Sequence, residues 1–370
     1  MIVFAAAFLM QAALARSTEA KPQPASPFET LSRQAAEARD ANHPAEAIAL
    51  YRKALKLKPD WADGLWAIGS IEYDQNHYKE CSADFLRLAN LKPDQTPGWI
   101  MAGLCEYHVP DYEAAFKSLT HAQQLGLQQS TELNHAARLH MALVLIKLGR
   151  FETAISKLVE LTRDTKKTPE IIVAAGIAGL RQAWTPPEVP EAERDKVFKL
   201  GDAMAAVMEG DSKAAVEKFD LAEHDYPKDP NIHFRYGAFL LRRLDPDRGV
   251  VEIGKTVELQ PDHIPALVSL ASIFLKREEL PQAKDYAEKA VKAAPEDFAT
   301  HVELGRVLRE ADDNAGALRE FETAVRLAPA SPESHYDLAS VYAKLGRAQD
   351  ARREREEFRR LRKVTDPNEP

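Results

Sequence analysis

Apolar and small residues recur along the chain in two stripes, and both stripes repeat every 34 residues. With Pro59 set as place 32 of the repeat, places 4, 7, 8 and 11 make the first stripe, and places 20, 24 and 27 make the second. Each stripe has the spacing of one face of an α-helix, so each repeat predicts a helix, a turn and a second helix. In this register, nine repeats begin at Phe28, Ala62, Thr96, His135, Lys196, Pro230, Ile264, Phe298 and Pro332; the first three and the last five follow one another without a gap.

Two places that played no part in setting the register hold only small residues. Place 8 is always Ala or Gly, place 20 is always Ala, Gly or Cys, and place 24 is large and apolar in seven repeats. We infer that the small residues let the two helices of a repeat cross closely, while the bulky residue fills the space beside the crossing. Place 8 holds Ala35, Gly69, Gly103, Ala142, Ala203, Gly237, Ala271, Gly305 and Ala339; place 20 holds Ala47, Cys81, Ala115, Ala154, Ala215, Gly249, Ala283, Ala317 and Ala351; the large residues at place 24 are Tyr51, Phe85, Leu119, Leu158, Phe219, Ile253 and Phe321.

Turn residues separate the predicted helices. Proline cannot continue a helix, so a Pro at place 32 is expected to end the second helix of six repeats. Gly149, in the sequence LGRF, can take the positive φ of a tight turn between two helices. Because one helical hairpin cannot bury both of its faces, the repeats must stack on one another. The six prolines are Pro59, Pro93, Pro227, Pro261, Pro295 and Pro329.

This pattern resembles the tetratricopeptide repeat family, whose signature is W-x2-L-G-x2-Y, then A-x3-F, then A and P. The resemblance implies an all-α fold, an α-solenoid in which antiparallel helix pairs of 34-residue repeats form a right-handed superhelix. By itself it says little about function. The third repeat carries the signature at Trp99, Gly103, Ala115 and Ala122, and the eighth carries it at Leu304, Gly305, Ala317, Phe321, Ala324 and Pro329.

The register also divides the chain into segments. We expect a signal peptide at 1–15, a linker at 16–27, an N-terminal array of four repeats at 28–168, an irregular helix and Pro-rich break at 169–195, a C-terminal array with a capping helix at 196–365, and a disordered tail at 366–370. At the break, we expect a helix from Glu170 to Trp184, prolines that forbid helix, and a new helix near Glu191. The break is either an irregular spacer that bends the superhelix or a binding loop or hinge.

The N-terminal residues favour export. Ile2 to Leu14 is apolar and uncharged, and an A-x-A site precedes Arg16, as is typical of a signal peptide. No basic residue precedes the apolar run, so an apolar anchor and a chance pattern stay open. The run is too short to span a bilayer comfortably, and no integral membrane span is expected after cleavage. The predicted location is periplasmic or secreted, in a bacterium, or cytoplasmic if the run is not a signal peptide.

The composition and the missing motifs argue against nucleic-acid binding, catalysis and metal or cofactor binding. The net charge of -8 is unfavourable for a nucleic-acid partner. The chain has no P-loop, no G-x-G-x-x-G and no H-E-x-x-H, and its eleven His never take a metal-binding spacing. His233, His301 and His335 share place 4 and are interpreted as packing residues. We therefore predict no catalytic residue, no cofactor and no metal.

The two cysteines fall on helices that should pack against each other. Cys81 is at place 20 of the second repeat, and Cys105 is at place 10 of the third. If the chain is exported, they can form a disulfide between neighbouring repeats. The alternative is that both are buried thiols that act as small apolar residues.

The resemblance also implies where a partner binds. In this family the first helix of each repeat lines the concave face, with places 2, 5, 9, 12 and 13 pointing inward. Large apolar side chains at those places predict a partner-binding groove, although the same side chains can instead pack against neighbouring helices. The predicted partner-binding residues are Trp66, Tyr73, Ile100, Tyr107, Leu143, Phe234 and Tyr336.

These observations predict a non-catalytic scaffold that binds a protein or peptide through its concave face, in the bacterial cell envelope. One alternative is a structural subunit of an envelope assembly. Another is an enzyme or a carbohydrate-binding protein with its site at the central break, where Glu188, Glu191, Glu193 and Asp195 gather without a nucleophile. The oligomeric state is not predicted.

Overall fold

The computed structural model describes residues 25–127, 132–164 and 167–365. The expected signal peptide, residues 16–24 of the expected linker and the expected tail at 366–370 lie outside these residues. Within them the chain forms nineteen α-helices and no strand, which confirms the all-α solenoid prediction. None of these helices is both long enough and apolar enough to cross a lipid bilayer.

Each of the nine repeats contributes two consecutive helices, and the break contributes one more. Repeats one to four form α1 (Pro27–Asp40), α2 (Pro44–Leu57), α3 (Ala62–Asp74), α4 (Tyr78–Leu91), α5 (Thr96–His108), α6 (Tyr112–Gln124), α7 (Glu132–Lys147) and α8 (Phe151–Asp164). The break holds α9 (Pro169–Gly179) and two 3-10 turns, η1 (Pro186–Glu188) and η2 (Glu191–Glu193). Repeats five to nine form α10 (Arg194–Glu209), α11 (Ser212–Asp225), α12 (Pro230–Arg243), α13 (Pro246–Leu259), α14 (Ile264–Lys276), α15 (Leu280–Ala293), α16 (Phe298–Glu310), α17 (Asn314–Leu327), α18 (Pro332–Lys344) and α19 (Ala348–Thr365).

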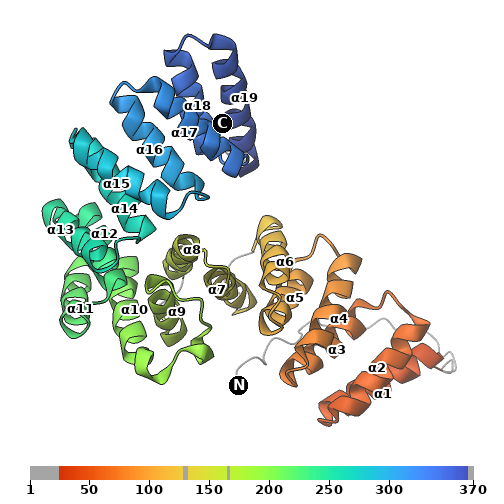
Figure 1. Cartoon of the computed structure of the whole chain (residues 1–370). Coiled ribbons are helices and arrows are strands. Elements are labelled where there is room, and N and C mark those ends of the chain that lie inside the picture. Colours follow the sequence, from red (N-terminus) through yellow and green to blue (C-terminus); the bar gives the residue numbers. More distant parts are fainter. Residues whose placement is uncertain (1–24, 128–131, 165–166, 366–370) are drawn as a thin grey trace, which may run out of the picture. The chain divides into compact units, whose positions relative to one another are not determined.

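The helices belong to two compact units. Of the described residues, the first unit holds 25–110 and 121–126, and the second holds 111–120, 127, 132–164 and 167–365. Within each unit, consecutive helices pack side by side, as α3 and α4 do in the first unit and α16 and α17 in the second (Figure 1). The break at 169–195 therefore lies inside the second unit. The segment boundaries drawn from the repeat register stay a prediction.

The small residues lie where the helices of a repeat cross. All eighteen residues at places 8 and 20 are buried, and so are all seven large residues at place 24. A Cβ added at Gly69 would lie 2.7 Å from the Phe85 ring, and one at Gly305 would lie 2.6 Å from the Phe321 ring. These distances are shorter than a carbon–carbon contact allows, so in these two repeats glycine at place 8 makes room for the phenylalanine ring at place 24.

The turn inside each repeat has a recurring backbone conformation. Place 15 takes a positive φ in seven of the nine repeats, at Asn42, Asn76, Gly149, Gly210, Glu278, Asp312 and Gly346. The prediction for Gly149 is therefore confirmed and holds more widely than expected. The other two are the third repeat, which has Pro110 at this place, and the sixth, in which Leu244 has a φ of -138°. In the sixth repeat the Asp245 side chain accepts a hydrogen bond from the Arg248 amide to start α13. The prolines at place 32 act as predicted, since the preceding helix ends two residues before each, as α2 does at Leu57 before Pro59.

The break forms a helix that packs against α10. A Cβ added at Gly176 of α9 would lie 1.9 Å from the Val197 carbonyl oxygen, so the two backbones almost touch. The helix ends at Gly179 rather than at Trp184, because Arg181 turns the chain with a φ of +57°. Arg235 of α12 holds this end in place: it donates to the Gly179 carbonyl at 3.3 Å and to both carboxylate oxygens of Glu152 at 2.8 Å.

A disulfide and an ion pair join repeats in the first compact unit. Cys81 of α4 and Cys105 of α5 are paired as a disulfide, with Cα atoms 6.0 Å apart, as in the bridged alternative. Arg52 of α2 donates to Glu72 of α3 at 2.7 Å and to Asp84 of α4 at 3.2 Å. The second carboxylate oxygen of Glu72 is buried and has no hydrogen-bond partner among the described residues. Burial therefore raises the pKa of Glu72 to about 7, although the Arg52 guanidinium opposes the shift.

Overpacking one crossing should destabilise the fold. Ala317 has no exposed surface, so Ala317→Leu should lower the free energy of unfolding by about 1–3 kcal/mol. Arg319 is exposed on the same helix, and Arg319→Leu should change it by about 0.5 kcal/mol or less. Urea unfolding followed by circular dichroism measures both. Equal effects of the two substitutions would mean that the register is wrong.

Glu72 should make the first compact unit less stable as the pH rises. Between pH 4.5 and about 7, folded Glu72 holds a proton that the unfolded chain has lost, so stability is greatest below this window and falls through it. Glu72→Gln should remove this part of the pH dependence and raise stability at pH 8 by about 1–3 kcal/mol. Urea unfolding at pH 5 and pH 8 measures the difference, with exposed Glu80→Gln as the control. An unchanged pH dependence in Glu72→Gln would contradict this assignment.

Candidate functional site

A pocket of about 260 Å³ opens in the first compact unit beside Trp66. Trp66 of α3, Leu88 of α4, and Pro97 and Gly98 at the start of α5 line it, with Ala62, Asp63, Lys92 and Gln95. Helix α5 comes close to α4 here because Gly98 has no side chain: a Cβ would lie 3.1 Å from the backbone of Ala89. We call this feature the Trp66 pocket.

Trp66 is held by the packing of its own repeat. Its ring meets the Phe85 ring edge-on, with centroids 5.3 Å apart, and Phe85 is the fully buried residue at place 24. Trp66 is still 38% exposed. The pocket therefore presents a rigid aromatic wall to solvent, with Asp63 and Lys92 as charged groups of opposite sign.

The structure places the seven predicted partner-binding residues in different environments. Trp66 and Tyr336 are exposed and Tyr73 is partly buried, so a partner at the surface would reach these three first. The other four are at most 7% exposed, as the packing alternative expects. Their role in binding stays a prediction. The four buried residues are Ile100, Tyr107, Leu143 and Phe234.

Three of the predicted partner-binding residues have their aromatic rings close to a histidine ring. Tyr73 lies 6.1 Å from the His108 ring, and Tyr107 lies 5.2 Å from it, so His108 joins two predicted residues in the first compact unit. In the second, Phe234 lies 4.9 Å from His263. Burial raises the pKa of Tyr73 and lowers that of His108, as expected for neutral side chains in an aromatic cluster.

Three histidines make a polar contact that the sequence did not predict. Each is buried at place 4, where its Nδ1 faces a Glu nineteen residues later and its Nε2 faces a proline carbonyl six residues earlier. We call this arrangement the His–Glu clasp. Because a carbonyl oxygen only accepts, Nε2 must carry a proton, which fixes how the ring is oriented. The clasps are His233 with Glu252 (2.9 Å) and Pro227 (2.9 Å), His301 with Glu320 (2.7 Å) and Pro295 (2.9 Å), and His335 with Glu354 (2.7 Å) and Pro329 (3.0 Å).

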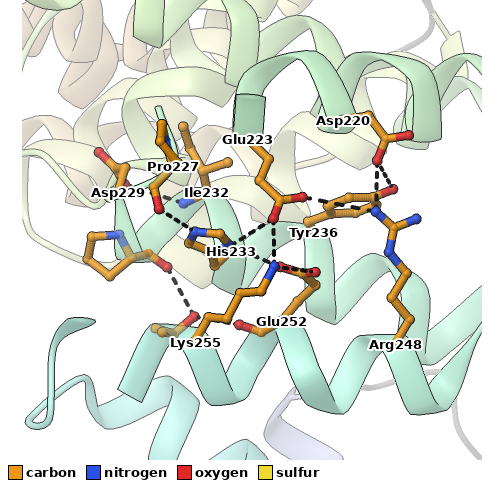
Figure 2. Close-up of polar contacts among 12 residues, drawn as sticks. Asp220, Glu223, Pro227, Asp229, Ile232, His233, Tyr236, Arg248, Glu252 and Lys255 are labelled. Atoms are coloured by element: carbon orange, nitrogen blue, oxygen red, sulfur yellow. Dashed lines mark hydrogen bonds and ion pairs between the residues drawn. The ribbon is translucent and has the colours of Figure 1, made fainter. Parts of the chain in front are cut away.

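The clasp of the sixth repeat is part of a larger cluster (Figure 2). Glu223 of α11 lies 3.6 Å from His233 Nδ1, and Lys255 Nζ of α13 lies 2.7 Å from Glu223 and 3.0 Å from Glu252. We call these four residues the His233 cluster. Burial alone would lower the pKa of His233, but its hydrogen bonds to Glu252 and Pro227 outweigh burial and raise it. Burial alone would raise the pKa of Glu252, but hydrogen bonds from His233 and Lys255 lower it.

A second polar contact beside this cluster fixes the same three helices. Tyr236 of α12 donates to Asp220 of α11 at 2.6 Å, and Arg248 of α13 donates to the same carboxylate at 2.8 Å (Figure 2). The Arg248 guanidinium also lies 4.7 Å from the centre of the Tyr236 ring. Burial and the Asp220 hydrogen bond together raise the pKa of Tyr236. This contact thus joins the three helices that carry the His233 cluster.

The carboxylates near the break are paired with neighbouring cations. A catalytic pair of carboxylates would face one substrate and differ in environment, whereas each of these acids meets a Lys or Arg of its own surroundings. Three of the four pairs join residues three or four apart in the chain, and the pair of Glu188 with Lys147 joins the break to α7. The pairs are Glu188 with Lys147 (2.8 Å), Glu191 with Arg194 (2.5 Å), Glu193 with Lys196 (2.9 Å) and Asp195 with Lys199 (2.7 Å).

Comparisons with known proteins point to one family. A family model described as tetratricopeptide repeat matches residues 33–95, and one described as the middle TPR-like domain of cilia and flagella-associated protein 70 matches residues 221–362. No curated protein matches the chain. A solved structure of MamA (41-end) from Desulfovibrio magneticus RS-1 is similar, with 20% identity over 46% of this chain and 97% of that chain, at a TM-score of 0.42. The structure described as MamA MSR-1 C2 has 19% identity over 46% of this chain and 98% of that chain, at a TM-score of 0.39.

Likenesses of that strength to solved structures say nothing about a site or an activity. The two family matches cover segments in which the 34-residue register and the helix pairs are both regular. The chain is a tetratricopeptide repeat protein, an all-helical scaffold of the class that binds other proteins.

Proposed function

We propose that this chain is a non-catalytic scaffold that binds a protein partner through the Trp66 pocket, on the face formed by the first helices of its repeats. The observation that carries the proposal is an exposed tryptophan, fixed by Phe85, on the wall of a pocket. Tryptophans held in this way lose little entropy on binding, and they dominate the binding energy of many protein interfaces.

The size of the pocket favours a side chain of a partner over a free small molecule. At about 260 Å³ it is smaller than the sites that usually enclose drug-sized ligands. An apolar side chain of an extended peptide or of a partner helix fits this space, packed against Trp66 and Leu88. Asp63 and Lys92 then meet polar groups of the partner beside it, as in the rim of a protein interface.

The location of the scaffold belongs to the same proposal. A disulfide between Cys81 and Cys105 suits an oxidising compartment. The apolar run at 2–14 followed by an A-x-A site suits export. Both observations support the proposal of a periplasmic or secreted location in a bacterium. Localisation of a tagged full-length chain by cell fractionation tests this part separately.

Removing the Trp66 side chain should weaken partner binding without unfolding the chain. Peptides selected against the wild-type chain from a random library serve as ligands, since selection needs no knowledge of the natural partner. Trp66→Ala should lower their affinity by about 2 kcal/mol, roughly thirtyfold, as expected for an aromatic anchor. Fluorescence anisotropy of labelled peptides measures the affinity.

The matched control is Leu221→Ala, which removes an exposed apolar side chain of α11. It should leave peptide affinity unchanged, and both variants should keep the wild-type circular dichroism spectrum. If Trp66→Ala binds the selected peptides as tightly as the wild-type chain does, the Trp66 pocket is not the binding site.

A further inference from the structure

The His233 cluster brings three metal-ligating groups together from three consecutive helices. Glu223 lies on α11, His233 on α12 and Glu252 on α13, and one ligand atom of each lies within 4.8 Å of the other two. Figure 2 shows their side chains converging on one point. An imidazole nitrogen with two carboxylate oxygens is a set of donors that suits Zn²⁺ and related divalent transition metals.

The surroundings of His233 orient the ring for this task. Its Nε2 faces the Pro227 carbonyl at 2.9 Å, so Nε2 carries a proton and Nδ1 points at the two carboxylates. Metal-binding histidines in proteins are commonly fixed in this way, by a hydrogen bond from the nitrogen that does not bind the metal. His233 and Glu252 are each 3% exposed, so two of the three donors are held in place by packing.

The other two His–Glu clasps show that the fold itself does not need Glu223. Glu223 is at place 28 of the repeat that precedes its clasp. The same place before His301 holds Val291, and before His335 it holds Val325. Both valines are partly buried and pack against the core of the last repeats. Glu223 is therefore a third donor added to a clasp that forms elsewhere without one.

Lys255 now supplies part of the charge that a metal ion would supply. Its ammonium lies between the two carboxylates, at 2.7 Å from Glu223 and 3.0 Å from Glu252. Its side chain is 39% exposed, so it can turn into solvent, and the Glu223 side chain is 20% exposed, which leaves a path for an ion. The corresponding place, 26, holds Thr323 and Glu357 in the repeats of the other two clasps, so among the three clasps only the one with the extra carboxylate has a lysine here.

We propose that His233, Glu223 and Glu252 form a binding site for one divalent transition-metal ion of the Zn²⁺ class. On binding, the ion takes the place of the Lys255 ammonium and of a proton on His233 Nδ1. The charge balances, because two carboxylates are neutralised first by an ammonium and an imidazolium and then by one dication. A water molecule from the Glu223 side completes a four-coordinate shell.

Such an ion would connect two repeats. Glu223 belongs to the fifth repeat, and His233 and Glu252 belong to the sixth, so metal binding cross-links α11 to the helix pair that follows it. A ligand that binds only the folded chain stabilises it by mass action. The site therefore makes the stability of this part of the array depend on metal availability, independently of whether the Trp66 pocket binds a partner.

Titration of the full-length, untagged and chelator-treated chain with Zn²⁺ tests the proposal by isothermal calorimetry. The wild-type chain should bind one Zn²⁺, and Glu223→Val, which restores the valine of the other clasps, should weaken binding at least tenfold while folding normally. Lys255→Met should tighten binding, since it removes the competing cation. His301→Gln breaks a clasp that lacks the third donor and should leave Zn²⁺ affinity unchanged.

Absorption of the Co²⁺-loaded chain should show the strong visible bands of four-coordinate cobalt, and Glu223→Val should lose them.

Three results would overturn the site. The first is equal Zn²⁺ affinity in the wild-type chain and Glu223→Val, which would place the ion at another of the histidines. The second is equal weakening by His301→Gln and Glu223→Val. The third is no saturable binding to the wild-type chain, even if Lys255→Met binds, because the ammonium would then exclude the ion from the natural protein.

Discussion

The close crossing of two helices at alanine- and glycine-sized residues is the constraint on which the rest of this structure depends. In the sixth repeat both contact places are glycine, and a Cβ at Gly237 would lie 2.8 Å from the Gly249 carbonyl oxygen. Backbones that approach this closely leave no space for a larger side chain. The crossing therefore fixes which face of each helix is buried, and the stack of repeats follows from it.

The candidate binding sites of this array use repeat places that take no part in the helix crossing. Trp66 is at place 5, beside the crossing of Gly69 with Phe85, and the crossing holds its ring while leaving part of it in solvent. The His–Glu clasps use places 4 and 23, which face each other across a repeat. Glu223 uses place 28, where the repeats before the other two clasps have valine. Each candidate site is thus a local departure from a shared packing scheme.

The sequence predicted the parts of the fold that depend on side-chain size and on proline. Residue size at places 8 and 20 repeats because the crossing repeats, and the helices end before the prolines because proline cannot continue them. The His–Glu clasp was not predicted, because its partners lie nineteen residues apart and a buried polar pair leaves no apolar periodicity. From the sequence alone, Glu252 would be predicted to be an exposed acidic residue on the polar face of an amphipathic helix.

The binding residues were harder to predict for a different reason. The register shows which side of a helix a residue lies on, but its exposure depends on how closely the following helices cover that side. Trp66 and Phe234 both occupy place 5, yet Trp66 is 38% exposed and Phe234 only 5%. Phe234 lies against His263, which precedes the next repeat, and that contact cannot be read from a 34-residue period.

A double-mutant cycle between Gly305 and Phe321 tests the crossing most directly. If the account is right, Gly305→Ala destabilises the chain because the new methyl group meets the Phe321 ring. Phe321→Leu should then relieve part of that cost, which gives a coupling free energy of about 1 kcal/mol or more in urea unfolding. Additive effects of the two substitutions, within about 0.3 kcal/mol, would contradict the claim that these two places pack against each other.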